Sequence, residues 1–304
     1  MSKFSVNILG CGSAIPTAMH QPSCQVVDFR DRLMMIDCGE GAQSMMRRMK
    51  LRFSRLTHIF VSHMHGDHCF GLPGLLSTMA LHEKGGSMVL HLPSGGIEVM
   101  RSFISYFCRE TPYDIIYEPI PTKGGLLYED DALTVEAFPL YHRLPCTGFI
   151  FREKPKLPHL RKDVLDFFNV PLAMRGAIKD GADFVTDDGV VVPNSRFVLP
   201  PEPSVSYAYA SDTMFDERVV KAVEGVDLLY HESTYSSELA NLARERGHST
   251  AADAGKVARM AGVKMLMLGH YSKRITDVQV LVDEAKKEFD VVIPANEGLK
   301  VDLL

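Results

Sequence analysis

A dense cluster of metal-binding side chains constrains this chain more than any other sequence feature. The segment SHMHGDH, residues 62–68, places three histidines and an aspartate within six positions, at the end of the predicted strand His58–Ser62. Imidazole and carboxylate are the groups that Zn²⁺ prefers in open, catalytic sites. A lone histidine is usually a core or surface residue, but four packed ligands without a metal would be costly to bury. The cluster therefore predicts a metal centre beyond the end of a strand.

The spacing within the cluster suggests how its ligands divide. Residues two apart in an extended segment face the same way, so His63 and His65 can bind one ion. Asp67 and His68, beyond the turn at Gly66, can then bind a second ion. The local pattern is therefore compatible with a site for two metal ions.

The rest of the chain alternates short β-branched runs with helical patterns. The predicted strands are Phe4–Leu9, Gln25–Phe29, Leu33–Asp37, His58–Ser62, Met88–Leu92, Leu133–Phe138, Val205–Ala210, Asp227–Tyr230 and Lys264–Leu268. The predicted helices are Ala42–Met49, Pro73–His82, Ile97–Phe107, Phe215–Val223, Ser236–Arg246, Ala251–Ala261 and Asp277–Phe289. Strands that alternate with helices in both halves indicate an α/β layered fold, with helices outside and sheet inside.

Composition excludes several classes of protein. The 304 residues include 33 Lys and Arg against 38 Asp and Glu, whereas a general nucleic-acid-coating protein would be strongly basic. The amino terminus lacks the apolar stretch of a signal peptide, and no run is long enough to predict a membrane span. The six cysteines are scattered without a C-x-x-C pair, which predicts reduced thiols in a cytoplasmic protein.

One stretch interrupts the alternating pattern. From Arg152 to Ser204 the sequence is rich in Pro, Lys, Asp and Gly, with one clear helical piece near Asp163–Phe168. About fifty residues without structure are unusual inside a compact domain, so a projecting arm or a lid is the better interpretation. Basic residues concentrate in its first half and acidic residues in its second, a pattern that a solvated surface hairpin would explain equally well.

The H-x-H-x-D-H pattern after a strand resembles the metallo-β-lactamase superfamily, which implies a four-layer αβ/βα sandwich with the metal site at one edge of the sheets. Three further candidates follow apolar runs: His142 in FPLYHRLPCTGF, Asp212 in SYAYASD and His270 in KMLMLGH. Taken alone, each has an ordinary alternative as a capping or turn residue. The resemblance implies that His63, His65 and His142 bind one zinc ion, that Asp67, His68 and His270 bind the other, and that Asp212 bridges both.

Longer segments are similar to ribonuclease Z, the family of endonucleases that remove the 3′ trailer from precursor tRNA. Residues 37–76 resemble the equivalent region of that family, and ASDT, HEST and GHST match its A-x-D-T, H-E-A-T and H-S-T segments. The similarity covers nearly the whole chain. It implies one domain over residues 1–304, an inserted arm at 152–204 that binds tRNA, and a homodimer.

Three residues are expected to act in catalysis. Asp67 is placed to orient the attacking hydroxide as well as to bind metal. A carboxylate beside an imidazole raises the pKa of the imidazole, so Glu232 would hold His248, and His248 would protonate the leaving 3′ oxygen. The products would be a tRNA with a 3′-hydroxyl and a trailer with a 5′-phosphate. As ordinary alternatives, Glu232 could be an acid at a helix start and His248 a residue of a capping region.

Substrate binding is assigned to Thr250, which could offer its hydroxyl or backbone N–H to a phosphate, to Arg175 in the arm, and to His20. The sequence departs from the family here, because P-x-K-x-R-N reads PTAMHQ over Pro16–Gln21. How the cleavage point is recognised, and whether an encoded CCA blocks cleavage, is therefore open. The arm also lacks the Gly-Pro pair that relatives usually carry.

Two other classes of function stay open from the sequence. A small-molecule metallohydrolase of the same superfamily, phosphodiesterase or arylsulfatase-like, would share much of the site but would not need the arm at 152–204. A metal-free binding or scaffold protein is the third class, and the presence of all seven ligands argues against it.

Overall fold

The computed structural model describes residues 4–82 and 85–303, and the chain divides into two compact units. Unit 1 comprises the residues up to Glu129, Thr134–Arg152 and the residues from Val205 onward. Unit 2 comprises Asp130–Leu133 and Glu153–Ser204. Among the described residues, no helix has the length and apolar character needed to cross a membrane.

Unit 1 contains two seven-stranded sheets. The first has the order β18 (Lys300–Asp302), β1 (Phe4–Gly10), β2 (Cys24–Phe29), β3 (Arg32–Ile36), β4 (Leu56–Phe60), β5 (Ser87–Pro93) and β6 (Asp114–Ile120). The second has the order β17 (Val292–Pro294), β16 (Met265–Gly269), β15 (Leu228–Glu232), β14 (Ser206–Ala210), β9 (Pro145–Glu153), β8 (Leu133–Tyr141) and β7 (Gly125–Glu129). Strands β3 to β6 run parallel to one another, and so do β14 to β17.

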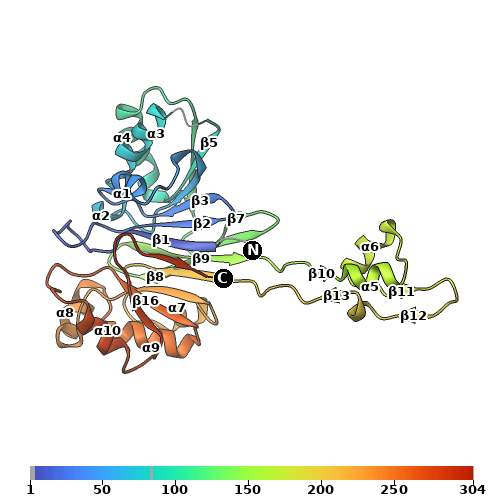
Figure 1. Ribbon diagram of the computed structural model, residues 1–304. Coiled ribbons are helices and arrows are strands. Elements are labelled where there is room, and N and C mark those ends of the chain that lie inside the picture. Colours follow the sequence, from blue (N-terminus) through green and yellow to red (C-terminus); the bar gives the residue numbers. More distant parts are fainter. Residues whose placement is uncertain (1–3, 83–84, 304) are drawn as a thin grey trace. The chain divides into compact units, whose positions relative to one another are not determined.

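Helices cover the outer face of each sheet (Figure 1). The first sheet is covered by α1 (Ala42–Arg48), α3 (Leu72–Leu81) and α4 (Ile97–Phe107), and the second by α7 (Glu217–Ala222), α8 (Ala240–Arg246), α9 (Ala251–Ala261) and α10 (Gln279–Ala285). The one-turn helix α2 (Gly66–Cys69) follows β4, and short 3₁₀ helices span Phe53–Arg55, Ser94–Gly96, Asn194–Arg196 and Ser237–Leu239. The predicted α/β fold, a four-layer αβ/βα sandwich, is confirmed.

The two sheets pack face to face through aromatic side chains. Strands β1, β2, β14 and β15 are buried along their whole length, as expected for strands covered on both faces. The ring of Phe60 lies 5.6 Å from that of Phe149 and 5.7 Å from that of Phe151, centre to centre. The Tyr209 hydroxyl, from the second sheet, donates to Asp37 Oδ2, from the first, at 2.7 Å. These contacts fix the ends of the two sheets relative to each other.

Unit 2 contains more regular structure than the sequence predicts. Its elements are α5 (Lys162–Phe167), α6 (Leu172–Lys179), a pair of strands β10 (His159–Leu160) and β13 (Val198–Leu199), and a pair β11 (Phe184–Val185) and β12 (Val191–Val192). It has its own small core of Leu165, Val170, Ile178, Phe184, Val192 and Phe197. The expectation of a single helical piece is wrong, because Pro171 at the N-cap of α6 and Gly176 inside it lower the helical signal of that segment.

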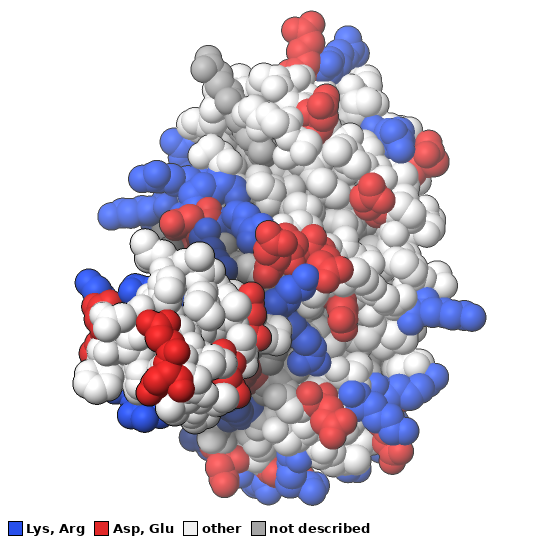
Figure 2. Space-filling model, turned by 90° about the vertical axis from the view of Figure 1, so that its right-hand side faces the viewer, with Lys and Arg blue, Asp and Glu red and all other residues white. Residues whose placement is uncertain are grey.

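Charged side chains of both signs lie on the face of the molecule that Figure 2 draws. Figure 2 shows Lys and Arg interspersed with Asp and Glu on the face that it draws, in keeping with a net charge of −5. Any strong attraction for a polyanion therefore has to come from a local group of basic residues rather than from the whole surface.

Candidate metal centre

The seven predicted ligands lie beyond the carboxyl ends of strands in both sheets of unit 1. His63, His65, Asp67 and His68 follow β4, His142 follows β8, Asp212 follows β14, and His270 follows β16. In open α/β sheets, the crevice outside the carboxyl ends of the strands is the usual place for a ligand. The structure thus brings together all the residues that the sequence assigned to the metals.

The first group contains His63, His65, His142 and Asp212, whose donor atoms all lie within 4.8 Å of one another. His63 Nε2 is 2.9 Å from His65 Nδ1. Asp212 Oδ2 is 3.7 Å from His63 Nε2 and 3.8 Å from His142 Nε2. Three imidazole nitrogens and one carboxylate oxygen at these spacings form a donor set that suits Zn²⁺.

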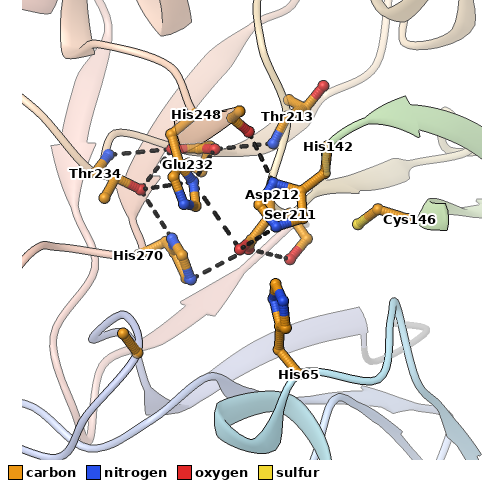
Figure 3. Close-up of polar contacts among 12 residues, drawn as sticks. His65, His142, Cys146, Ser211, Asp212, Thr213, Glu232, Thr234, His248 and His270 are labelled. Carbon is orange, nitrogen blue, oxygen red and sulfur yellow. Dashed lines mark hydrogen bonds and ion pairs between the residues drawn. The ribbon is translucent and has the colours of Figure 1, made fainter. Parts of the chain in front are cut away.

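The second group contains Asp67, His68 and His270, again within 4.8 Å of one another. Asp67 Oδ2 lies 3.4 Å from His68 Nε2 and 3.7 Å from His270 Nε2. Asp212 Oδ1 lies 3.4 Å and 3.1 Å from the same two nitrogens. Each oxygen of Asp212 therefore faces a different group, and Figure 3 shows this side chain at the centre of the site.

The hydrogen bonds of the histidines test whether these residues fit metal ions. The Nε2 atoms of His68, His142 and His270 are buried and have no hydrogen-bond partner in the described part of the chain. The Nδ1 atom of each of these histidines has a partner. His68 Nδ1 is 2.7 Å from Asp37, His142 Nδ1 is 2.8 Å from a backbone carbonyl, and His270 Nδ1 is 2.9 Å from the Thr234 hydroxyl. An Nδ1–H held by an acceptor leaves the Nε2 lone pair free for a metal. The residues therefore fit metal ions.

The electrostatics of the site also favour a bound cation. Burial, together with the neighbouring imidazoles, lowers the pKa of His63 and of His65, so both are neutral ligands at neutral pH. Burial disfavours a charge on His68 too, but the three carboxylates around it outweigh burial and raise its pKa. Because the carboxylates stabilise a protonated imidazole at this buried position, they would also stabilise a bound cation there.

Glu232 and His248 form a pair beside Asp212. His248 Nδ1 donates to Glu232 Oε1 at 2.8 Å, and Glu232 is fully buried. The carboxylate also accepts the backbone N–H groups of Thr213 at 2.8 Å and Thr234 at 3.2 Å (Figure 3). Burial lowers the pKa of His248, but Glu232 and then Asp212 raise it to about 9. His248 is thus charged at neutral pH and can release a proton from Nε2.

A pocket of 610 Å³ opens over these residues, lined among others by Asp67, Asp212 and His248. Two predicted substrate contacts lie outside its lining. The Thr250 hydroxyl is engaged with Asp253 in the capping box of α9, and His20 is buried against Glu297 at 3.0 Å. Their roles in binding substrate stay predictions.

The third predicted substrate contact, Arg175, belongs to unit 2. It lies in α6, where its guanidinium is 3.2 Å from Asp166 and also donates to the backbone carbonyl of Val170 at 3.3 Å. Its role in binding substrate stays a prediction.

The sequence analysis missed two residues that support the ligands. Asp37, just past β3, has a positive φ of 54° and accepts hydrogen bonds from the Ser62 N–H at 2.7 Å, the Ser62 hydroxyl at 2.9 Å and the Tyr209 hydroxyl, besides binding His68. The Thr234 hydroxyl donates to Glu232 and accepts from His270. Thr234 is the last residue of the HEST segment, so this motif could have identified it from the sequence.

We expect Asp37→Asn to lower the affinity of the second metal group by about 10- to 100-fold, because the amide cannot hold the Nδ1–H of His68 as the carboxylate does. Equilibrium dialysis against Zn²⁺ would measure the affinity. Asp227→Asn is a matched control, since Asp227 also accepts the N–H and hydroxyl of a serine, Ser206, at 2.7 and 2.8 Å. Equal zinc affinity in wild type and Asp37→Asn would contradict the expectation.

Known proteins resemble this chain over its full length. It is 48% identical over 304 residues to ribonuclease Z of Parabacteroides distasonis and 47% identical over 304 residues to ribonuclease Z of Porphyromonas gingivalis, in each case covering 100% of both chains. It is also 42% identical to ribonuclease Z of Azobacteroides pseudotrichonymphae, again over 100% of both chains. A family model described as anti-Pycsar protein Apyc1 matches residues 4–102, less than half of the chain.

Solved structures share the fold. The short form of human tRNase Z superposes with a TM-score of 0.70 at 24% identity, and the metallo-β-lactamase fold protein YhfI of Bacillus subtilis with a TM-score of 0.71 at 18% identity, each covering 99% of both chains. At these identities the likeness shows the fold alone. The full-length identity of 47% to 48% to curated relatives shows the family as well as the fold. The chain belongs to the ribonuclease Z family, endoribonucleases built on the metallo-β-lactamase fold.

Proposed function

We propose that this protein removes the 3′ trailer from precursor tRNA and requires two zinc ions to do so. The observation that carries the proposal is the position of Asp212, whose two oxygens face two separate groups of metal ligands beside the Glu232–His248 pair. Relatives named ribonuclease Z, and the fold shared with human tRNase Z, support precursor tRNA as the substrate.

The metal ligands divide between the two ions. His63, His65 and His142 would hold one ion, Asp67, His68 and His270 the other, and Asp212 would belong to both. When bound, the two ions would lower the pKa of a water molecule and neutralise negative charge on the scissile phosphate. Asp67 lines the pocket, and its Oδ2 faces His68 and His270, so its carboxylate is placed to orient the attacking water.

His248 would supply the proton that the leaving group needs. Glu232 Oε1 holds the Nδ1–H, which fixes the ring so that Nε2 carries the transferable proton. Transfer of that proton to the leaving 3′ oxygen, as the phosphorus–oxygen bond breaks, leaves a 3′-hydroxyl on the tRNA and a 5′-phosphate on the trailer. The charge on Glu232 stabilises the protonated imidazole before transfer.

Basic side chains around the pocket favour a polyanionic substrate. Arg143, Arg246, Lys273 and Arg274 are exposed and line the pocket. Across residues 4–82 and 85–303, none of the four is held in an ion pair, so their charges are available to RNA phosphates on either side of the cleaved bond. A small neutral substrate would have no use for four such cations.

The proposal is tested by incubating zinc-loaded protein with two tRNA precursors, one with an encoded CCA and one without, and mapping the ends that are produced. We expect cleavage beside the discriminator base. Comparison of the two precursors shows whether CCA protects despite the altered Pro16–Gln21 segment. Failure to cut either precursor, with metal bound and a chromogenic phosphodiester hydrolysed, would favour the small-molecule hydrolase instead.

We expect that replacing residues 156–201 of unit 2 with a short Gly/Ser linker raises KM for precursor tRNA by about 10- to 100-fold, because the inserted arm would add contacts to the tRNA backbone. Hydrolysis of bis(p-nitrophenyl) phosphate should be unchanged, since the pocket and its ligands lie in unit 1. Steady-state kinetics on both substrates measures the effect. An unchanged KM for the precursor would exclude a tRNA-binding role for the arm.

We further infer a homodimer in the cytoplasm. Helix α4 exposes Val99, Phe103, Tyr106 and Phe107 by 68%, 45%, 65% and 56%, and their spacing places them on one face of the helix. An exposed apolar patch of this kind usually marks a protein–protein interface, and sedimentation velocity tests whether the chain pairs in solution.

All six cysteines are free, which supports a reducing compartment.

A further inference from the structure

The loop from Gly12 to His20 forms one wall of the pocket and touches a proposed metal ligand. Ser13, Ala14 and the two residues after them line the pocket. The backbone N–H of Ala14 donates to Asp67 Oδ2 at 2.7 Å. Ala14 reaches this position with a φ of 62°, a left-handed conformation that alanine rarely adopts and that the surrounding structure must therefore enforce.

The base of the loop is closed by a residue far away in the sequence. Glu297, between β17 and β18, accepts the backbone N–H of Cys11 at 3.3 Å and that of Gln21 at 2.8 Å with the same oxygen, Oε1. Its other oxygen, Oε2, is 3.0 Å from Nδ1 of His20. One carboxylate thus binds both ends of the loop, and the Gly12 N–H completes the closure by donating to the Gln21 carbonyl at 2.9 Å.

The side chains of Cys11, His20 and Glu297 are close enough to hold a metal ion, but their hydrogen bonds favour another role. Two backbone N–H groups point their positive ends at Glu297, an arrangement that stabilises a carboxylate without a cation. The Cys11 thiol is 3.5 Å from the Ala295 carbonyl, to which it can donate. The Glu297 carboxylate, the Cys11 thiol and His20 Nδ1 are thus all engaged in hydrogen bonds, whereas His20 Nε2 is buried without a partner in the described part of the chain.

We propose that Glu297 is a positioning residue for the reaction: by closing the base of the loop, it holds the Ala14 N–H on Asp67 Oδ2. That N–H restricts the rotation of the carboxylate, so the oxygen stays 3.4 Å from His68 Nε2 and 3.7 Å from His270 Nε2. His20 serves this closure and not the substrate, which explains why it is buried. The inference rests on the proposal that Asp67 binds metal.

The first test replaces Glu297 with alanine. Because outer hydrogen bonds of metal ligands typically contribute a factor of about 10 to 100, we expect kcat for precursor cleavage to fall by that factor, with KM nearly unchanged. Zinc affinity of the second group should fall, while that of the His63 group should not. Glu297→Gln should restore most of kcat, since its amide oxygen can still accept both N–H groups and its NH₂ can donate to His20.

A second readout needs neither metal nor activity. In metal-free protein, amide hydrogen exchange at Gly12 and Ala14 should be faster in Glu297→Ala than in wild type, because the loop opens more often. Glu284→Ala is the matched control: Glu284 also accepts two donors, the N–H and hydroxyl of Ser237 at 2.8 and 2.9 Å, and it is not among the residues that line the pocket.

The outcomes separate the two proposals. If wild type binds only one zinc ion, the two-metal proposal fails, and the exchange measurement still decides whether Glu297 closes the loop. If wild type binds two ions, and Glu297→Ala matches the Glu284→Ala control in zinc affinity, kcat and exchange at Ala14, then Glu297 does not position Asp67. A fall in melting temperature with equal loss of both ions would likewise overturn the inference, since it would indicate a general structural role.

Discussion

Replacing Asp212 with alanine is expected to remove both metal ions and to reduce cleavage of precursor tRNA to background. Asp212 is 2% exposed, and its two oxygens lie between 3.1 and 3.8 Å from four histidine nitrogens, two in each group. Without this carboxylate, each ion would lose a ligand. The two ions would also lose the negative charge that offsets their mutual repulsion, so both affinities should fall together.

The measurement is zinc content per chain after gel filtration, followed by single-turnover cleavage. Asp216→Ala is a matched control, because Asp216 lies four residues later and caps α7 instead of facing the metals. His63→Ala is the third variant, and it should weaken the binding of one ion far more than the binding of the other. If Asp212→Ala keeps one ion with wild-type affinity, Asp212 is not shared between the two groups.

Helices and strands could be predicted from the sequence where the local pattern of apolar and capping residues matches the burial found in the folded chain. The helices Ile97–Phe107 and Ala251–Ala261 have the bounds that were predicted, and the second begins at a capping box, Thr250 with Asp253. Strands β6, β7, β9, β17 and β18 of the two large sheets were missed. Pro119 lies within β6, and a proline inside an apolar run argues against a central strand when only the sequence is read, although β6 lies at the edge of its sheet.

The seven candidate ligands could be proposed from the sequence because four of them are nearly consecutive, and because the resemblance to a known family points to the other three at the ends of apolar runs. The residues that support them could not, because their roles arise from contacts between distant segments. Tyr209 binds Asp37 across 172 positions, and Glu297 binds the Cys11 N–H across 286. No local pattern encodes such pairs. The contact of His20 with Glu297 could not be foreseen for the same reason, since Glu297 lies at the other end of the chain.

Replacing His248 with alanine is expected to lower kcat for precursor tRNA by about 10²- to 10⁴-fold, the usual contribution of a positioned general acid. The effect should depend on the leaving group. A ribose 3′ oxygen is a poor leaving group and needs the proton, whereas p-nitrophenolate leaves without one. Hydrolysis of bis(p-nitrophenyl) phosphate by His248→Ala should therefore stay near the wild-type rate, and zinc content should not change, because His248 Nδ1 is engaged by Glu232.

Two further variants sharpen this test. Glu232→Gln keeps an acceptor for the Thr213 N–H but removes the charge that raises the pKa of His248, so its loss of kcat on precursor tRNA should be smaller than that of His248→Ala. His82→Ala replaces an exposed histidine at the C-cap of α3, and it should change the rate of hydrolysis of neither substrate. If His248→Ala slows both substrates equally, the imidazole does not donate the proton to the leaving oxygen. Its contact with Asp212, at 3.9 Å, would then indicate that it orients the bridging carboxylate instead.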